Sequence, residues 1–379
     1  MNVLITGGAG FIGSHTVDAL LAQGHVVRVL DLLDPQIHGQ DASFPRRGHA
    51  HIEYIKGDVR NVEDVTLALE SVDAVYHFAA LTGVGQSMYD IRNYVDVNCT
   101  GTATLLEAIV KRNRPIQRFI LASSRAVYGE GTHRCEEHGS IFPHMRKRED
   151  LNEGNFDYLC PLCGKQLLAR PTAEERPLNP VSVYAWTKKQ QEEYCRYAAD
   201  TFGLSVTILR YFNVYGSRQS LKNPYTGLIS IFFSRMMAHQ PIFLYEHGKP
   251  SRDFVHVSDV VEANVLALNA NIKSPACINV GTGQERSITD IANALAEACG
   301  VAPDFKDTED YRVGDIRSCF ADLNRAKQLL CYQPRVTLEA GMREFCDWAR
   351  HQESVDLYEK TVDELERHGL FGRGKKQVG

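Results

Sequence analysis

The sequence has little that would place the chain in a membrane or on a nucleic acid. None of its apolar runs approaches the roughly 18 to 20 residues that a helix needs to cross a bilayer. The formal net charge of -5 gives no basic excess of the kind that binds nucleic acid or anionic lipid. The opening residues lack the charged start and small-residue cleavage site of a secretory signal. We therefore expect a cytoplasmic protein that binds neither membrane nor nucleic acid.

Internal repeats and low-complexity tracts are also missing. The 379 residues are 44% hydrophobic and 23% charged, so the chain is long enough to bury a substantial core and to form two lobes. Because no secretory signal is present, the ten cysteines are expected to be thiols or metal ligands before they are disulfides. Seven of them are scattered and suit core packing: Cys99, Cys195, Cys277, Cys299, Cys319, Cys331 and Cys346.

Short β-branched runs alternate with helical patterns through the first half of the chain. The expected strands lie at 2–7, 25–31, 51–58, 74–80, 118–124 and 204–216, and the expected helices at 13–24, 98–112 and 183–203. Strands separated by helices of this length require right-handed crossovers and a parallel sheet covered on both faces. The pattern predicts an α/β fold, a Rossmann-type doubly wound parallel sheet with a smaller C-terminal lobe.

Three glycines, Gly7, Gly10 and Gly13, follow the first expected strand and open the first helix. Glycines at this spacing allow a tight turn, the approach of backbone N–H groups to a pyrophosphate, and close packing of helix on strand. The same pattern alone also fits a plain tight turn. Here the second strand ends in Asp31, at the distance where a carboxylate accepts both ribose hydroxyls and repels a 2′-phosphate. The context therefore predicts NAD as a cofactor.

A catalytic set is expected from Ser124, Tyr184 and Lys188. Tyr184 and Lys188 are four residues apart on an expected helix and so share one face. An ammonium beside a phenol lowers the phenol's pKa from about 10 and makes it a general base. Ser124 ends a strand at the edge where parallel sheets bind ligands. A tyrosine–lysine pair alone also fits the surface of a helix, but the combination with the glycines favours catalysis.

Eight motifs lie across nearly the whole chain: "TGGAGFIGSH" (6–15), "HFAA" (77–80), "VNCTGT" (97–102), "SSRAVYG" (123–129), "PVSVYAWTK" (180–188), "LRYFNVYG" (209–216), "RDFVHVSDVV" (252–261) and "RVGDIR" (312–317). Together they resemble the extended short-chain dehydrogenases/reductases that modify nucleotide-diphosphate sugars. The resemblance implies the same catalytic set, and it implies a homodimer formed through helices at 99–112 and 183–200.

The resemblance also assigns binding residues. Besides the three glycines, Asp31, Tyr184 and Lys188, it implies that the cofactor is lined by Phe11, Ile12, Asp58, Val59, Ala79, Ala80, Asn98 and Tyr211. Ser124, Asn213, Arg252 and Arg312 are implied to hold the sugar nucleotide. The two arginines also make physical sense unaided, because paired guanidinium groups neutralise a diphosphate. The alternative is that they form surface salt bridges beside Asp253 and Asp315.

The residues after Ser124 narrow the reaction. The family's 4,6-dehydratases carry an acidic pair there, since elimination of water needs a proton donor and an acceptor. Its glucuronate decarboxylases show a pattern with a glutamate at the same positions. This chain has Arg125 and Ala126, and NADPH-dependent reductases are not expected to carry Asp31. Epimerisation at C4 remains: Tyr184 takes the C4 hydroxyl proton while hydride moves to NAD, the 4-keto sugar turns, and hydride returns to its other face. The role of Arg125 stays open.

The sequence says less about the sugar. The "SSRAVYGEG" segment and the cysteine-containing insertion resemble bacterial enzymes that act on dTDP-6-deoxyhexoses, which favours a substrate such as dTDP-L-rhamnose. UDP-glucose and UDP-uronates are the alternatives, and a dehydratase or reductase is a further one. A protein of another class, an NAD-binding scaffold without catalysis, is disfavoured by the intact Ser–Tyr–Lys set.

About forty residues, 130–170, stand where relatives have a short loop before a "PxxE" segment, here Pro171 to Glu174. Inside them are four soft or borderline ligands, enough to close a tetrahedral zinc site with no open position: Cys135, His138, Cys160 and Cys163. We expect a structural zinc that folds a loop with few apolar residues. The alternatives are a metal-free loop, or His133 or His144 in place of His138. Because the loop leaves the sheet beside Tyr128, we expect it to border the sugar pocket.

These expectations combine into a domain plan. Residues 1–216 form an NAD-binding Rossmann domain that carries the insertion at 130–170. Residues 217–350 mainly form a substrate-binding lobe, with 255–283 returning to the Rossmann sheet. Residues 351–379 form a charged, helical C-terminal tail.

Overall fold

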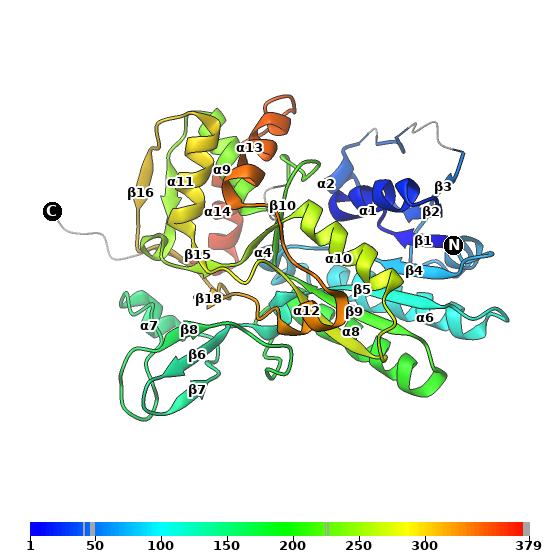
Figure 1. The fold of residues 1–379 in the computed structure, drawn as a ribbon. Helices are drawn as coiled ribbons and strands as arrows, with labels where there is room; N and C mark the ends of the chain where they lie inside the picture. The colour runs from blue at the N-terminus through cyan, green and yellow to red at the C-terminus, as the bar shows by residue number, and fades with distance from the viewer. Residues whose placement is uncertain (41, 46–49, 224, 226, 374–379) are drawn as a thin grey trace.

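The computed structural model describes residues 1–379 except 41, 46–49, 224, 226 and 374–379. Its centre is a seven-stranded sheet of order β14-β9-β5-β4-β1-β2-β3 (Figure 1). The strands are β1 (Asn2–Thr6), β2 (Val26–Asp31), β3 (Ile52–Lys56), β4 (Ala74–His77), β5 (Arg118–Ser124), β9 (Val206–Tyr211) and β14 (Ala276–Val280). Every pairing in this sheet is parallel. The predicted Rossmann-type α/β fold is confirmed.

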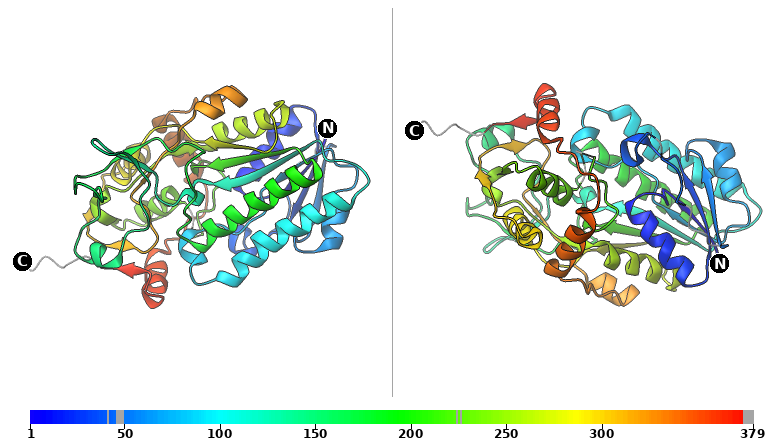
Figure 2. Two further views of the ribbon diagram at one scale, coloured as in Figure 1. Left: turned by 90° about the horizontal axis from the view of Figure 1, so that it is seen from below. Right: turned by 90° about the horizontal axis from the view of Figure 1, so that it is seen from above.

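Helices cover both faces of the sheet, as Figure 2 shows. One face carries α1 (Phe11–Ala22) and α10 (Val257–Asn269), and the other carries α3 (Val62–Ala68), α6 (Gly101–Lys111) and α8 (Val183–Phe202). Because side chains alternate along a strand, Val3 and Ile5 enter the core under α1 and α10 while Leu4 enters the opposite core. A strand that is buried on both faces must be apolar throughout, which explains the "VLI" and "FIL" runs.

Shorter elements connect this framework. They are α2 (Pro35–His38), α4 (Val84–Ser87), α5 (Ile91–Val95), the π-helical turn η1 (Asp96–Thr100), the 3-10 turn η2 (Arg125–Tyr128), β10 (Asn213–Tyr215) and α12 (Asn324–Leu330). The helix predicted at 98–112 thus begins inside a π-helical turn. Sequence periodicity does not reveal such a turn, because it inserts one residue into an otherwise regular helix.

A second lobe lies beyond the C-terminal ends of the sheet strands (Figure 2). Its helices are α9 (Leu228–Met237), α11 (Ile288–Cys299) and α13 (Leu338–Ala349), and Phe232, Ile291 and Phe345 are buried among them. Its short strands and one 3-10 turn are β11 (Ile242–Leu244), η3 (Tyr245–Gly248), β12 (Ser251–Arg252), β13 (Phe254–His256), β15 (Arg286–Ser287), β16 (Phe305–Asp307), β17 (Tyr311–Arg312) and β18 (Ser318–Cys319).

The C-terminal tail is more than the charged helix that the sequence predicts. It contains α14 (Tyr358–Arg367) and then β19 (Phe371–Gly372), which pairs antiparallel with β17 and sets Phe371 opposite Arg312. The Glu364 carboxylate accepts hydrogen bonds from the hydroxyls of Tyr89 and Tyr225. The tail therefore packs on the body of the protein, and residues 374–379 of the prediction lie outside the described chain.

The insertion forms a small sheet of its own. Its elements are β6 (Thr132–Cys135), β7 (Gly139–Ile141), α7 (Arg148–Asn152) and β8 (Leu168–Arg170), and the strand order is β7-β6-β8 with antiparallel pairings. Cys135, Cys160 and Leu167 form its small buried cluster. Among the described helices, none combines the length and the apolar character required to span a bilayer.

Candidate functional site

The glycine turn after β1 brings three backbone segments into close approach. Gly7 has a φ of 71°, and a Cβ there would lie 2.7 Å from the backbone nitrogen of Ala79. A Cβ at Gly13 would lie 2.3 Å from the carbonyl oxygen of Gly7. Side chains are excluded at both positions, whereas a Cβ at Gly10 would meet only that oxygen, at 3.3 Å. The turn therefore presents bare backbone at the start of α1, where N–H groups attract an anion.

Asp31 lies against this turn at the end of β2. Its carboxylate accepts hydrogen bonds from the backbone nitrogens of Ala9 and Leu33, both at 2.9 Å, and its side chain is buried. Phe11 and Ile12 are the first residues of α1, and Ala79 and Ala80 follow β4. The predicted cofactor residues of β1, β2 and β4 thus gather at one edge of the sheet.

Asp58 and Val59 follow β3 at the same edge. Burial alone would raise the pKa of the Asp58 carboxyl, but hydrogen bonds from Arg60 outweigh burial and lower it. The Arg60 guanidinium approaches Asp58 to 2.6 Å and also pairs with Asp96 at 2.7 Å. Val59 is buried against Gly101, where a Cβ would lie 2.7 Å from a Val59 methyl carbon. Asp58 is therefore held ionised.

Asn98 lies in the π-helical turn η1 and is fully buried. Its side-chain oxygen accepts from the Leu81 nitrogen at 2.8 Å, and its nitrogen donates to the Leu81 carbonyl at 3.1 Å and to the Thr187 hydroxyl at 2.9 Å. The Thr187 hydroxyl donates in turn to the Tyr184 carbonyl. Asn98 thus links the loop after β4 to the first turn of α8, where the predicted catalytic tyrosine lies.

Ser124 and Tyr184 come together from β5 and α8. Ser182 caps α8 by accepting from the Ala185 nitrogen at 3.2 Å, which fixes the first turn. The half-buried Tyr184 phenol lies within hydrogen-bonding reach of the Ser124 hydroxyl. Burial raises the pKa of Tyr184, while the Ser124 hydroxyl and the positive charge of Arg125 act against that rise.

Lys188 lies one turn further along α8 and is almost fully buried. Its Nζ donates to the carbonyl oxygen of Ala122 on β5 at 2.8 Å, and burial lowers its pKa to about 8. The prediction that the Lys188 ammonium lowers the pKa of Tyr184 stays a prediction, because Lys188 is not among the groups that act on the phenol's pKa in these contacts. The cation whose charge acts on the phenol is Arg125.

Tyr211 ends β9 and Asn213 begins β10, the next strand along the chain. The two side chains make different contacts. The Tyr211 hydroxyl donates to the side-chain oxygen of Asn264 on α10 at 2.6 Å, so this ring packs within the core of the sheet. The side-chain oxygen of Asn213 is buried and has no hydrogen-bond partner in the described part of the chain. A buried acceptor without a partner carries a free-energy cost that a donor on a ligand relieves.

Arg252 lies buried at the end of β12. Its guanidinium donates to the carbonyl oxygens of Ser251 at 2.7 Å, Ile316 at 2.7 Å and Arg317 at 3.2 Å. Burial, followed by the charge of Arg125, lowers its pKa to about 10. The neighbouring Asp253 carboxylate is instead bonded to Thr282, Gly283 and Ala321. The alternative of an Arg252–Asp253 salt bridge is therefore wrong.

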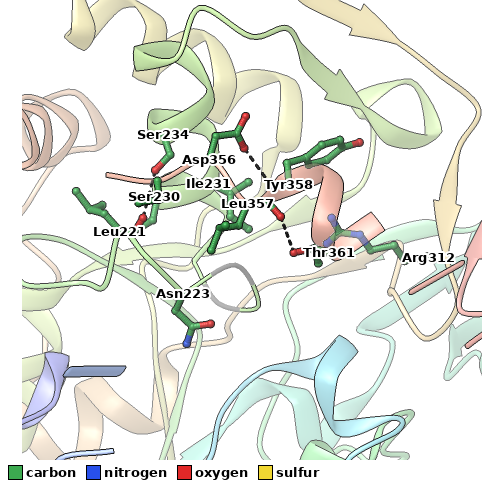
Figure 3. A pocket seen from close by; sticks show the side chains of 11 residues that line it. Leu221, Asn223, Ser230, Ile231, Ser234, Arg312, Asp356, Leu357, Tyr358 and Thr361 are labelled. Atoms are coloured by element: carbon green, nitrogen blue, oxygen red, sulfur yellow. Dashed lines mark hydrogen bonds between the residues drawn. The ribbon is translucent and has the colours of Figure 1, made fainter. Parts of the chain in front are cut away.

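Arg312 lines a pocket between α9 and the C-terminal segment (Figure 3). Its guanidinium carbon lies 5.2 Å from the centre of the Tyr245 ring. Across the pocket Ser230 is buried, and its hydroxyl has no hydrogen-bond partner among the residues described. Asp356, Tyr358 and Thr361 supply the wall from the tail. The pocket lining does not include Ser124, Tyr184 or Lys188, so the pocket lies outside the predicted catalytic set.

The four predicted metal ligands lie together in the insertion. Their ligand atoms are all within 4.8 Å of one another: those of Cys135, His138, Cys160 and Cys163. The His138 Nδ1 is 3.5 Å from the sulfurs of both Cys135 and Cys160, and the Cys135 and Cys163 sulfurs are 3.6 Å apart. A tetrahedral zinc with ordinary bond lengths requires edges of about 3.6–3.8 Å. The hairpin between β6 and β7 presents His138, whereas His133 packs on Tyr158 and His144 contacts Asn179.

Sequence reasoning missed a buried ionic group behind the predicted catalytic residues. Glu192 of α8 accepts from Arg210 of β9 at 2.9 and 2.7 Å and from the Ser123 hydroxyl at 2.5 Å. The Arg210 guanidinium lies 4.7 Å from the centre of the Tyr128 ring. Glu192 lies one turn after Lys188 on α8, and this spacing indicates that it shares the buried face of the helix. The sequence near Glu192 gives no sign that its partner is Arg210, which lies on β9.

The chain is similar to known proteins over most of its length. The profile of the "NAD dependent epimerase/dehydratase family" matches residues 3–147 and 163–281. The dTDP-L-rhamnose 4-epimerase of Burkholderia thailandensis is 35% identical over 91% of this chain and 94% of its own. The UDP-glucose 4-epimerase of Mycolicibacterium smegmatis is 31% identical over 93% of this chain and 99% of its own.

Solved structures agree with these relatives. The UDP-glucose 4-epimerase of Thermotoga maritima, solved with UDP-glucose, has a TM-score of 0.75 and 29% identity over 92% of this chain and 99% of its own. The UDP-glucuronic acid 4-epimerase of Bacillus cereus, solved with UDP-glucuronic acid and NAD, has a TM-score of 0.74 and 27% identity over 92% of this chain and 99% of its own.

Proposed function

The chain belongs to the NAD-dependent epimerase/dehydratase family, and from this premise we propose that it inverts C4 of a nucleotide-diphosphate sugar through a transient 4-keto sugar. The observation that carries the proposal is the meeting of Ser124 and Tyr184 at the C-terminal end of β5, beside Arg125 and Ala126. This arrangement offers one proton-transfer group and none of the acidic neighbours that elimination of water requires.

The residues at the sheet edge fit NAD. The backbone cradle at Gly7 and Gly13 leaves no room for a Cβ, and Asp31 brings a carboxylate to the same turn. This fits a pyrophosphate beside a ribose with two free hydroxyls and disfavours a 2′-phosphate. When bound, NAD supplies the reversible acceptance of hydride from C4. Phe11, Ile12, Asp58, Val59, Ala79 and Ala80 lie on the elements that border this cradle.

The chain's own residues handle the proton. Tyr184 accepts the proton of the C4 hydroxyl and returns it after the sugar has turned, and Ser124 holds the same oxygen by a hydrogen bond. Arg125 stabilises the phenolate, since its charge acts against the raised pKa of the half-buried phenol. Lys188 fixes α8 on β5 through the Ala122 carbonyl and contributes positive charge behind the phenol.

Asn213, Arg252 and Arg312 bind the diphosphate and sugar. The buried acceptor of Asn213 has no partner among the described residues, and Arg252 faces backbone carbonyls without an ion-pairing carboxylate in the described chain. Both groups therefore gain an interaction when a sugar diphosphate arrives. The 35% identity to a dTDP-L-rhamnose 4-epimerase favours a dTDP-6-deoxyhexose such as dTDP-L-rhamnose, with UDP-glucose and UDP-uronates as the next candidates.

Incubation with dTDP-, UDP- and GDP-sugars, with no added reductant and products read by NMR, tests the reaction and the sugar together. Tyr184→Phe is expected to lower kcat by about 10²–10⁴-fold while the bound NAD content stays unchanged. Tyr197→Phe, on the exposed side of the same helix, is the matched control and keeps full activity. Conversion that requires NADPH would point to a reductase instead.

The cysteine and histidine cluster supports a structural zinc. All four ligands come from protein, and no position is left for substrate, so the metal stabilises the fold of the insertion and takes no part in proton transfer.

Exposed apolar side chains support a homodimer. Trp186 and Tyr197 are 55% and 63% exposed and lie on one face of α8, while Ile91 of α5 is 52% exposed. A second copy that packs α5, α6 and α8 against the same helices buries them. In sedimentation experiments we expect the unaltered chain to be a dimer and the Trp186→Glu variant to be a monomer.

A further inference from the structure

We propose that the Cys/His insertion positions Arg252 for the sugar nucleotide, and that it does so by holding residues 315–318, called the carbonyl segment below. This inference rests on the proposed function, because it assumes that Arg252 binds the sugar diphosphate. It makes the insertion part of the binding machinery although none of its residues needs to touch the ligand.

The carbonyl segment sets the orientation of Arg252. Two of the three carbonyls that receive its guanidinium belong to Ile316 and Arg317, at 2.7 and 3.2 Å. The third belongs to Ser251 on its own strand. Since no carboxylate pairs with Arg252 among the described residues, a shift of the carbonyl segment moves the guanidinium with it.

The first residues of the insertion hold the opposite side of this segment. The Glu130 carboxylate, which is 1% exposed, accepts from the backbone nitrogens of Arg317 at 2.7 Å and Ser318 at 2.6 Å. The Gly131 nitrogen donates to the Ser318 carbonyl at 2.8 Å. The insertion is therefore bonded to two N–H groups and to the Ser318 carbonyl of the segment, while Arg252 is bonded to the carbonyls of Ile316 and Arg317.

Two further residues of the insertion fix the same segment through an ion network. Arg146 donates to the Asp315 carbonyl at 2.9 Å and forms a paired contact with Glu246 at 2.6 and 2.8 Å. The Arg317 side chain pairs with Glu246 at 3.0 Å and with Asp157 at 2.6 Å. Arg146 and Glu246 are almost fully buried, where hydrogen-bonded charges resist displacement strongly.

The metal cluster joins the two parts of the insertion that hold the segment. Cys135 ends β6, the strand that begins just after Glu130 and Gly131, and Cys160 stands three residues after Asp157. A zinc bound to both cysteines fixes the spacing of Glu130 and Asp157 on either side of Arg317. Occupancy of the metal site is thereby linked to the geometry of Arg252.

The double variant Arg146→Met/Glu246→Met tests this link without leaving a buried charge of that pair unpartnered. We expect the KM for the converted sugar nucleotide to rise roughly tenfold, with kcat nearly unchanged and the NAD content unchanged. The matched control is Lys165→Met/Glu137→Met, which removes an exposed ion pair of the same insertion and leaves KM unchanged. An unaltered KM in the folded first variant overturns the inference, and so does a parallel loss of NAD, which indicates general loosening.

Amide hydrogen exchange supplies a readout that does not depend on turnover. After zinc is removed with a chelator, exchange at Arg317 and Ser318 is expected to accelerate at least tenfold while amides of α1 and α10 keep their protection. Unchanged exchange at these two amides contradicts the inference even if the enzyme is active. If the unaltered protein converts no sugar nucleotide, the proposed function fails instead, and the exchange result still reports whether the insertion holds the carbonyl segment.

Discussion

The Nζ of Lys188 lies 2.8 Å from the carbonyl oxygen of Ala122, two residues before Ser124 on β5. The lysine of α8 is thus bonded to the strand that carries the serine. Helix α8 and strand β5 are joined by this contact and by the hydrogen bond of Ser123 with Glu192, and α8 is joined to β9 by the Arg210–Glu192 pair. The relative positions of Ser124 and Tyr184 therefore depend on buried polar contacts of α8 with β5 and β9.

The charge on Lys188 predicts an alkaline limit for catalysis. Burial lowers its pKa to about 8, so the ammonium loses its proton as the pH rises through that value, well before a free lysine does. We expect kcat to fall above about pH 8 with one titrating group. The pH profile of Lys188→Arg checks the assignment, because a guanidinium stays charged. An unchanged alkaline limb in that variant assigns the titration to another group.

The linkage of this lysine to folding has a definite sign. Its folded pKa of about 8 lies below the ordinary value of 10.5, so the unfolded chain binds more protons between these two pH values. The contribution of Lys188 to the free energy of unfolding therefore rises with pH across this window. Urea unfolding of the native chain and of Lys188→Met at pH 7.5 and 10 checks this: the difference between them should shift in favour of the native chain at the higher pH.

Gly13→Ala is expected to damage both folding and cofactor binding. The new Cβ would lie 2.3 Å from the Gly7 carbonyl, and backbone cannot yield as a side chain does, so we expect a loss of about 1–3 kcal/mol in the free energy of unfolding. Bound NAD should fall with it. Gly10→Ala is the matched control, because its Cβ would meet the same oxygen at 3.3 Å. Equal NAD content in the two variants would refute the role of the close approach at Gly13.

Arg210→Met is expected to cost about 3–5 kcal/mol of unfolding free energy, because it leaves the fully buried Glu192 carboxylate without its paired donor. Chemical denaturation measures the loss. Arg218→Met removes an exposed contact with Asp18 at 2.7 Å and should cost less than about 1 kcal/mol. If both variants lose the same free energy of unfolding, the buried Arg210–Glu192 pair contributes no more to stability than the exposed contact, and the prediction is wrong.

Metal analysis of the purified chain is expected to find one zinc per chain. Removal of the metal, or Cys163→Ser, should lower the melting temperature by about 5 °C or more, since the insertion has only a small apolar cluster to hold it. Cys331→Ser changes an exposed cysteine outside the cluster and serves as the control. A protein that binds no zinc and melts unchanged after Cys163→Ser would leave the four side chains as a metal-free cluster.

The parts of the site that depend on local pattern were predictable. Glycines at Gly7 and Gly13, the strand ending in Ser124, and the helical spacing of Tyr184 and Lys188 each express geometry within a few residues. The Cys-x-x-His and Cys-x-x-Cys pairs were also predictable as metal ligands, because few residue types bind zinc and their spacing is restricted.

What the sequence did not reveal depends on contacts between distant segments. The bond of Lys188 to Ala122 spans 66 residues, and the network of Arg146, Glu246 and Arg317 joins three separate stretches. Neither has a periodic or spacing signal. The π-helical turn that buries Asn98 was hidden for another reason, since it changes helix geometry without changing the composition of the helix.

The short pairing of β19 with β17 has a practical side. Phe371 sits opposite Arg312, which lines the pocket, so anything fused shortly after that position is anchored close to a residue that we propose binds the sugar nucleotide. Purification handles are better attached ahead of Met1, whose amino group lies by the half-buried His25 at the far end of the sheet.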